Sequence, residues 1–327
     1  MTQYTDRDAL VVFTHGSSNM AGWQSDNSQV FSDPVTPATL DGVDVWGRWL
    51  AAGNRTNGGG GPFAFEPMTA LQNFQLDGVA PPYGIARRYW ERYYSPAAKA
   101  SVVQAPKAVY FINGAFSSMQ CTQSSGQLAP LTSMYPGAEN QVVALLVYKL
   151  IAEDYWTEGL QALENDPTID NVYVDGFYWC GDETAMQDPA NEGATDITAY
   201  QVAAGLSDMI AGCEYYVGLE PGTMPFVGVK PPTQYVVNDN VSATPLVQID
   251  TVRQQYDRFL EITNNPAAII DGNDFALKSG ETNISHYTSD SMITIGESMF
   301  GARQGLGASP LKVRATRTTV VPMAANE

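Results

Sequence analysis

Five short apolar runs divide the chain, and the stretches between them have the spacing of amphipathic helices. The runs cover residues 9–14, 109–112, 171–179, 225–229 and 267–271. The predicted helices cover residues 84–94, 140–163, 197–213, 247–263 and 289–301. Strands without polar alternation are typical of parallel sheets that are covered on both faces. We therefore predict an α/β fold, a three-layer α/β/α sandwich around a central parallel sheet.

The charge balance excludes several classes of partner. The 327 residues include 35 acidic and 17 basic side chains, which gives a formal net charge of −18. Phosphate binding needs a basic surface, so we expect neither a nucleic acid nor an anionic membrane as a partner. No window approaches the roughly 20 apolar residues that a membrane-spanning helix needs. The first ten residues, MTQYTDRDAL, lack a basic region followed by an apolar core, so we predict no secretory signal and a location in the cytoplasm or on a virus particle.

The periodic segments predict one domain over residues 1–306, followed by an extended C-terminal tail over residues 307–327. The domain includes a long, polar and Gly-rich insertion at about residues 23–82, which we predict to be irregular apart from one short helix over 67–74. The three cysteines are Cys121, Cys180 and Cys213. They form no CxxC pair and no zinc-ligand spacing, so we expect buried thiols and no metal.

The chain has only two histidines, His15 and His286, and histidine is the commonest general base near neutral pH. Ser18 follows the first predicted strand on a tight turn rich in small residues, and its hydroxyl needs such a base to act as a nucleophile. Because the carboxyl ends of parallel strands share one edge of the sheet, His286, just beyond the last strand, can lie beside Ser18. Two alternatives stay open at this point: Ser18 as a helix cap, and His286 as a solvent-exposed neighbour of a helix N-cap. His15 lies on the same strand as the nucleophile, so we expect it to pack or to support the site from behind, with a role as the base as the alternative.

The amino-acid sequences of these segments resemble those of a known family. Residues 16–22 read GSSNMAG and resemble the GQSNMAG block of the SGNH hydrolases, in particular the sialate O-acetylesterase and acetylxylan esterase branch. Four further segments resemble later blocks in the same order: PPYGIA (81–86), INGAFSS (112–118), YWCGDE (178–183) and SHYTS (285–289) with Gly296 and Glu297. The resemblance covers roughly residues 8–303 and implies a flavodoxin-like SGNH-hydrolase version of the predicted sandwich.

This resemblance implies a serine esterase that removes an acyl group, most plausibly acetyl, from a carbohydrate, without metal or organic cofactor. Ser18 is the implied nucleophile and His286 the implied base. Backbone N–H groups of Ser18, Ser117 and Ser118 are the expected oxyanion donors. The expected substrate-binding residues are Asn19, Asp182, Glu183 and Trp179, of which Trp179 has the alternative of filling the core.

Three departures from the family pattern alter the groups around this pair. Asn283 stands where the family usually has the aspartate that steadies the catalytic imidazolium. A Ser–His dyad is then one solution, and help from Glu281, Asp271 or Asp274 is the other. Cys180 replaces a glutamine that is a polar donor, and Ser117 with Ser118 replaces a Gly-Gly pair. The pattern fits a divergent esterase and equally a hydrolase scaffold with weakened activity.

A second class of function stays open beside the esterase. The six lysines, the abundant Gly, Asn and Thr, and the tail over 311–327 favour a structural or carbohydrate-binding component of a virus particle or surface assembly. In that case the tail is the expected arm for homo-oligomer or particle assembly. The two hypotheses are compatible, since a particle-borne deacetylase satisfies both.

Overall fold

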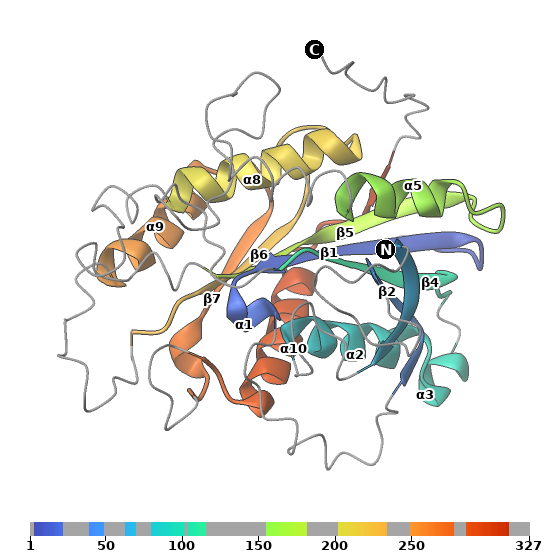
Figure 1. Cartoon of the computed structure of the whole chain (residues 1–327), viewed down its shortest axis with the longest axis horizontal. Helices are drawn as coiled ribbons and strands as arrows, with labels where there is room; N and C mark the ends of the chain where they lie inside the picture. The colour runs from blue at the N-terminus through green and yellow to red at the C-terminus, as the bar shows by residue number, and fades with distance from the viewer. Residues whose placement is uncertain are drawn as a thin grey trace.

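The computed structural model describes residues 3–21, 39–48, 63–69, 80–101, 104–115, 155–181, 202–233, 249–277 and 286–313 (Figure 1). The strands are β1 (Asp8–Gly16), β2 (Thr39–Arg48), β3 (Phe63–Thr69), β4 (Ala108–Asn113), β5 (Asn171–Cys180), β6 (Phe226–Lys230), β7 (Ala267–Asp271) and β8 (Leu311–Lys312). The helices are α1 (Ser18–Ala21), α2 (Pro81–Tyr93), α3 (Pro96–Lys99), α5 (Glu158–Glu164), α8 (Val202–Val217), α9 (Ile249–Ile262) and α10 (Ser289–Gly305), with a 3₁₀ turn η4 (Gly272–Asp274). None of the helices within these ranges is long and apolar enough to cross a bilayer.

The described strands form one sheet in the order β3-β2-β4-β1-β5-β6-β7. Every pair from β2 to β7 in this order is parallel, and the strands β4-β1-β5-β6-β7 follow one another in the flavodoxin-like order 2-1-3-4-5. β1 and β4 are buried along their whole length, which explains their unbroken apolar sequences, since both faces of a central parallel strand are covered. The predicted central parallel sheet is confirmed.

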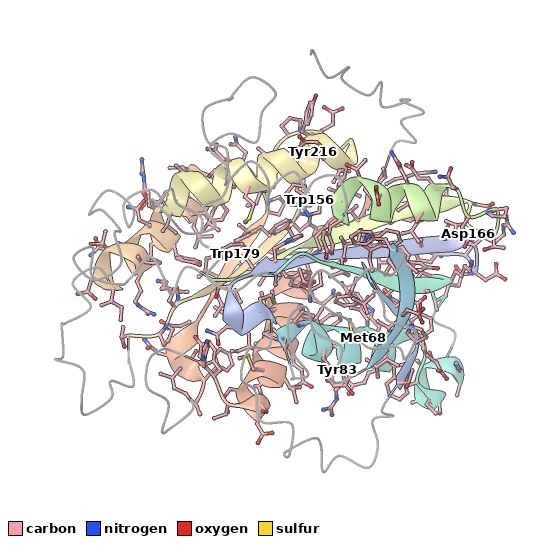
Figure 2. All side chains as sticks on the ribbon, viewed as in Figure 1. Met68, Tyr83, Trp156, Asp166, Trp179 and Tyr216 are labelled. Carbon is pink, nitrogen blue, oxygen red and sulfur yellow. The ribbon has the colours of Figure 1, made fainter. Side chains whose placement is uncertain are left out.

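Helices cover both faces of the sheet, as the sandwich prediction requires. In Figure 1, α5 and α8 lie above the sheet, and α2, α3 and α10 lie below it. Figure 2 shows the aromatic side chains that fill the two layers: Trp156 and Tyr216 lie on the α5–α8 side, with ring centroids 6.3 Å apart, and Tyr83 lies on the α2 side. The two apolar layers merge into one continuous core.

The insertion at 23–82 is less irregular than predicted. Residues 39–48 form β2, which joins the sheet in parallel beside β4, and residues 63–69 form β3, which pairs antiparallel with β2 at the edge. The helix predicted over 67–74 is therefore wrong for its first three residues, which belong to β3. Residues 70–74 lie outside the described residues.

The predicted tail is also partly structured. Leu311 and Lys312 form β8, which pairs antiparallel with Val174 and Tyr173 of β5. β8 takes the position beside the first half of β5 that β6 leaves open, because β6 pairs only from Phe177 onward. Residues 314–327 lie outside the described residues, so a truncation that tests the tail as an assembly arm has to begin after Val313.

The close crossing of α2 and α10 fixes the position of α10, the helix that begins just after His286. Gly84 of α2 and Gly296 of α10 face each other, and a Cβ on Gly296 would overlap the Pro81 carbonyl and approach the Ile85 nitrogen to 2.8 Å. Two helix backbones can approach this closely only where neither residue has a side chain. The crossing thus depends on the glycines that the PPYGIA and Gly296-Glu297 segments supply.

Gly296→Ala is expected to lower the free energy of unfolding by about 1–3 kcal/mol, because an added methyl group forces the two backbones apart. Gly301→Ala is the matched control on the same helix, since a Cβ there meets nothing within 4 Å. The control should gain up to about 1 kcal/mol from the better helix propensity of alanine. Urea unfolding of both variants measures the difference, and equal midpoints would contradict the crossing described here.

Candidate active site

The turn that follows β1 brings the ends of two central strands together. The Ser17 N–H donates to the Cys180 carbonyl at 2.9 Å, across the ends of β1 and β5. Gly16 makes this approach possible, because its φ is 151° and a Cβ there would overlap the same carbonyl. Only glycine adopts this conformation without strain. Ser18 comes directly after this turn as the first residue of α1, and its side chain lies outside what the structure describes.

A hydrogen bond joins α1 to the segment that carries His286. The Tyr287 N–H donates to Asn19 Oδ1 at 3.3 Å, although the two residues are 268 positions apart in the sequence. Asn19 is fully buried, and His286 and Tyr287 are each 1% exposed. Since Ser18 and His286 are the immediate chain neighbours of the bonded residues, the fold brings the expected nucleophile and the expected base to the same edge of the sheet.

The His286 segment is held in place from its other side as well. Tyr287 forms an antiparallel bridge with Leu277, and the Thr288 N–H donates to the Ala276 carbonyl at 3.0 Å. The Thr288 hydroxyl then accepts from the Ser291 N–H at 3.2 Å and caps α10. His286 thus lies between the chain that leaves β7 and the start of a long buried helix, which is a fixed position for a side chain that has to meet a partner.

The remaining expected site residues fall mostly outside the described residues. These are Ser117, Ser118, Asp182, Glu183, Glu281 and Asn283. The strand that leads to the first two ends at Asn113, which is buried and whose Oδ1 accepts from the Ala115 N–H at 3.3 Å. Thr14 of β1 is the register partner of Asn113, so the chain that leads to Ser117 leaves the sheet beside the α1 turn.

His15 is a structural residue and not the base. Its Nε2 accepts a hydrogen bond from the Trp156 indole N–H at 2.7 Å, and its ring stacks on Phe177 with centroids 4.9 Å apart. Burial lowers the pKa of His15 to about 3, so the imidazole is neutral at any physiological pH. To take a serine proton, Nε2 would have to give up the Trp156 hydrogen bond and carry a charge in a buried position. The expectation that His15 packs in the core is confirmed.

Trp179 belongs to the core beneath the site. Its side chain is fully buried, and its indole N–H donates to the Tyr256 hydroxyl at 3.0 Å. A sugar ring needs an open aromatic face on which to stack, and Trp179 offers none in this structure. The structure therefore corrects the expectation of substrate binding and gives Trp179 the core role that the sequence left open.

The carboxylate of Asp271, one of the expected third members, is engaged by two other residues. It pairs with Arg253 at 2.6 Å and accepts from the Asn273 N–H at 2.9 Å. The hydrogen bonds that join Asn19 to Tyr287 and His15 to Trp156 were not predicted, because no local pattern marks contacts between segments so far apart. Cys180 and Cys213 are buried, as expected, and form no disulfide within the described residues, while Cys121 lies outside them. Within the described part of the chain, no group of three His, Cys, Asp or Glu side chains is placed to hold a metal ion.

Comparisons with known proteins identify the fold. No protein-family model and no curated protein matches the sequence. The crystal structure of NanS matches with a TM-score of 0.52 at 11% sequence identity, over 94% of this chain and 98% of that chain. The chain has the fold of that structure, a three-layer α/β/α sandwich. Est24, a carbohydrate acetylesterase from Sinorhizobium meliloti, matches with a TM-score of 0.46 at 11% identity over 90% of this chain and 99% of its own. The native M. smegmatis aryl esterase matches with a TM-score of 0.46 at 10% identity over 90% and 99%.

The order of the strands in the sheet gives the α1 turn a particular place. β4 lies on one side of β1 and β5 on the other, so the direction in which successive strands are added to the sheet reverses at β1. Ligands of open α/β sheets bind outside the carboxyl ends of the strands at such a switch point. Ser18 and the His286 segment both lie at this point.

Proposed function

We propose that this protein is a serine esterase that removes an acetyl group from a carbohydrate. The observation that carries the proposal is the hydrogen bond from the Tyr287 N–H to Asn19 Oδ1, which places the chain neighbours Ser18 and His286 at one strand edge. The likeness of the fold to NanS and the GSSNMAG and SHYTS segments support the same assignment. Carbohydrate as the substrate class comes from the sequence resemblance.

In this mechanism the Ser18 oxygen attacks the ester carbonyl carbon while His286 accepts the hydroxyl proton. The carbonyl oxygen becomes an oxyanion, which the N–H groups of Ser18 and of Ser117 or Ser118 stabilise. The bond to the sugar oxygen then breaks, and His286 returns the proton to the leaving alcohol. Water attacks the acetyl-Ser18 ester, gives a proton to His286 and releases acetate, while the proton returns to Ser18.

His15 takes no part in this mechanism, since its Nε2 is occupied by Trp156. Asn283 stands where the family usually has an aspartate, and the backbone bonds of Tyr287 and Thr288 hold the segment that carries His286. We propose either a Ser–His dyad or a triad whose third member is Glu281 or Asp274.

The test measures acetate release from O-acetylated xylan and from O-acetylated sialic acid. The wild-type protein is expected to release acetate from at least one of them, and Ser18→Ala is expected to release none above background. Ser17→Ala is the matched control, because it keeps the backbone bond to Cys180 and removes the neighbouring hydroxyl. Acetate release by Ser18→Ala at the wild-type rate, or by no form of the protein, contradicts the proposal.

A further inference from the structure

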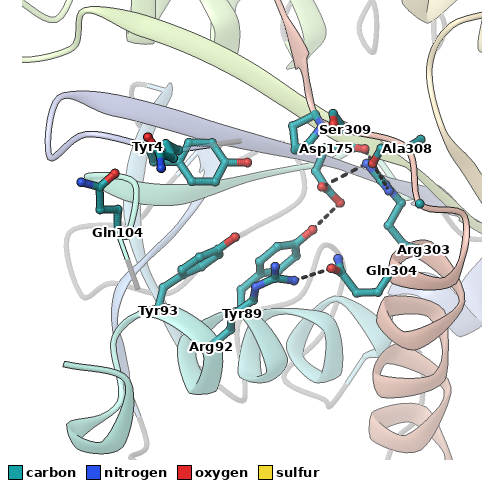
Figure 3. Close-up of a pocket in the computed structure, with 13 residues that line it drawn as sticks. Tyr4, Tyr89, Arg92, Tyr93, Gln104, Asp175, Arg303, Gln304, Ala308 and Ser309 are labelled. Atoms are coloured by element: carbon teal, nitrogen blue, oxygen red, sulfur yellow. Dashed lines mark hydrogen bonds and ion pairs between the residues drawn. The ribbon is translucent and has the colours of Figure 1, made fainter. Parts of the chain in front are cut away.

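A cavity lies at the edge of the sheet opposite to the proposed active site. Its volume is about 580 Å³, within the range of small-molecule sites. It is lined by the last turns of α2 and α10, by the segments that precede β1 and β4, and by residues 307–310 (Figure 3). Helices of a parallel α/β fold run opposite to the strands, so their C-terminal ends mark the amino edge of the sheet. Ser18 and His286 lie at the carboxyl edge.

Two buried phenols, those of Tyr4 and Tyr93, face this cavity. Tyr4 and Tyr93 are 4% and 8% exposed, and Figure 3 shows both hydroxyl groups pointing into the cavity. Neither hydroxyl makes a hydrogen bond to a residue within the described ranges, while the two rings pack edge to face with centroids 6.1 Å apart. Burial raises the pKa of both phenols, so both stay protonated and available as donors.

Asp175 does not compete for these donors. Its carboxylate accepts hydrogen bonds from Tyr89 and from Tyr178, the second at 3.1 Å, and lies 3.3 Å from Arg303 Nη2. The Arg303 Nε also donates to the Asp175 carbonyl at 2.7 Å. Asp175 and Arg303 therefore cancel each other in charge, although Arg303 Nη2 makes no hydrogen bond to a described residue.

Arg92 supplies the uncompensated charge of the cavity. Its Nη1 donates to Gln304, and its guanidinium carbon lies 5.3 Å from the centroid of the Tyr93 ring (Figure 3). It forms no ion pair with an acidic residue in the described part of the chain. The cavity thus presents one net positive charge in a protein whose formal net charge is −18.

We propose that this cavity is a binding site for a small hydroxylated carboxylate of the size of an acidic monosaccharide. One free guanidinium matches the single charge of a planar carboxylate, which it can bind through two parallel N–H bonds. The Tyr4 and Tyr93 hydroxyls donate to oxygen atoms of the same ligand. The site is separate from the proposed catalytic residues and does not require turnover.

The test is a calorimetric titration of the Ser18→Ala full-length protein with D-glucuronate and with D-glucose. Glucuronate is expected to bind in the millimolar range and at least tenfold more tightly than glucose, because the two sugars differ in the carboxylate that Arg92 binds. Arg92→Gln is expected to weaken glucuronate binding at least tenfold, and Tyr4→Phe and Tyr93→Phe severalfold each. Arg88→Gln is the matched control on α2, since Arg88 is exposed and pairs with Glu91; its affinity should stay within twofold of the parent.

Thermal unfolding of each variant, measured beside the titration, separates lost binding from lost structure. Tyr4→Phe and Tyr93→Phe keep the aromatic packing, so they provide folded variants even where Arg92→Gln is unstable. Absence of saturable binding by glucuronate, equal affinity for glucose, or unchanged affinity in the folded Arg92→Gln variant overturns the proposal. Binding that survives all substitutions in this cavity would place the ligand in the active site instead, and would leave the esterase assignment untouched.

Discussion

Removing the Ser18 hydroxyl should lower kcat/KM for p-nitrophenyl acetate by roughly 10⁴-fold or more, the scale at which serine hydrolases lose activity without their nucleophile. His286→Ala should cost a similar factor, because the hydroxyl is not nucleophilic at neutral pH without a base. The double variant should be no slower than the slower single variant, since the two groups act in one step and their effects are not additive. Steady-state kinetics of the three proteins measures these ratios.

Each deviation from this pattern has a definite meaning. Losses that multiply in the double variant would show that Ser18 and His286 act in separate steps. Full activity of His286→Ala would leave no base for the reaction, because the only other histidine, His15, is neutral and already accepts the Trp156 N–H. Either result contradicts a Ser–His pair. Ser17→Ala, which alters the adjacent side chain, should keep its activity within about tenfold of wild type, since its hydroxyl is placed in no catalytic step.

Acid should destabilise the protein through His15. Burial holds the pKa of this group at about 3 in the folded state, against about 6.5 in an unfolded chain. Above pH 6.5 neither state binds the proton and stability is unaffected. As the pH falls from 6.5 toward 3, the unfolded state alone binds it, so the free energy of unfolding falls by about 1.4 kcal/mol for each pH unit and by about 5 kcal/mol in total.

A variant without the ionisable ring isolates this effect. His15→Gln offers an amide oxygen to the Trp156 N–H and does not titrate, so it lacks the His15 slope while keeping the contributions of all carboxylates. Urea unfolding of both proteins at pH 7, 6, 5 and 4 gives the stability difference as a function of pH. The difference should shrink by about 1.4 kcal/mol per unit below pH 6.5. Parallel profiles over this range would show that His15 is not held neutral.

The central parallel strands could be predicted because their burial in the structure is visible in the sequence as runs of apolar residues. β1 and β4 are buried on both faces, so nearly every position is apolar and no alternative period competes. The helix ends were less certain: α8 continues four residues beyond the predicted end at 213, since nothing in that stretch breaks a helix. Of the helix predicted over 140–163, residues 158–164 form α5, and 140–154 lie outside the described residues.

β3 and β8 were missed for physical reasons. β3 contains Pro67, which argues against a strand in the interior of a sheet, but β3 is an edge strand, where a missing N–H costs no ladder bond. β8 has only two residues, which are too few to show the alternation of apolar and polar residues that predicts a strand. Its pairing depends on the length by which β5 extends beyond β6, which is a tertiary property.

For the candidate site, the sequence predicted that Ser18 and His286 lie at one edge of the sheet. It did not predict the hydrogen bond that joins their two segments. The GSSNMAG and SHYTS segments mark where Ser18 and His286 lie along the chain. The Asn19–Tyr287 hydrogen bond joins residues 268 positions apart, and no local signal encodes it. The sequence also could not decide the role of Trp179. An aromatic residue near the end of a strand looks the same in the sequence whether it fills the core or binds a sugar at the surface.

The most direct test of the paired Ser18 and His286 is covalent labelling with diisopropyl fluorophosphate, followed by fragment mass spectrometry that resolves Ser17 from Ser18. The reagent forms a stable ester only with a serine whose hydroxyl is activated by a base. The account predicts one phosphoryl adduct per chain, on Ser18, that forms in the wild-type protein and not in His286→Ala. An adduct on another serine, no adduct at all, or equal labelling of Ser18 in His286→Ala would contradict it.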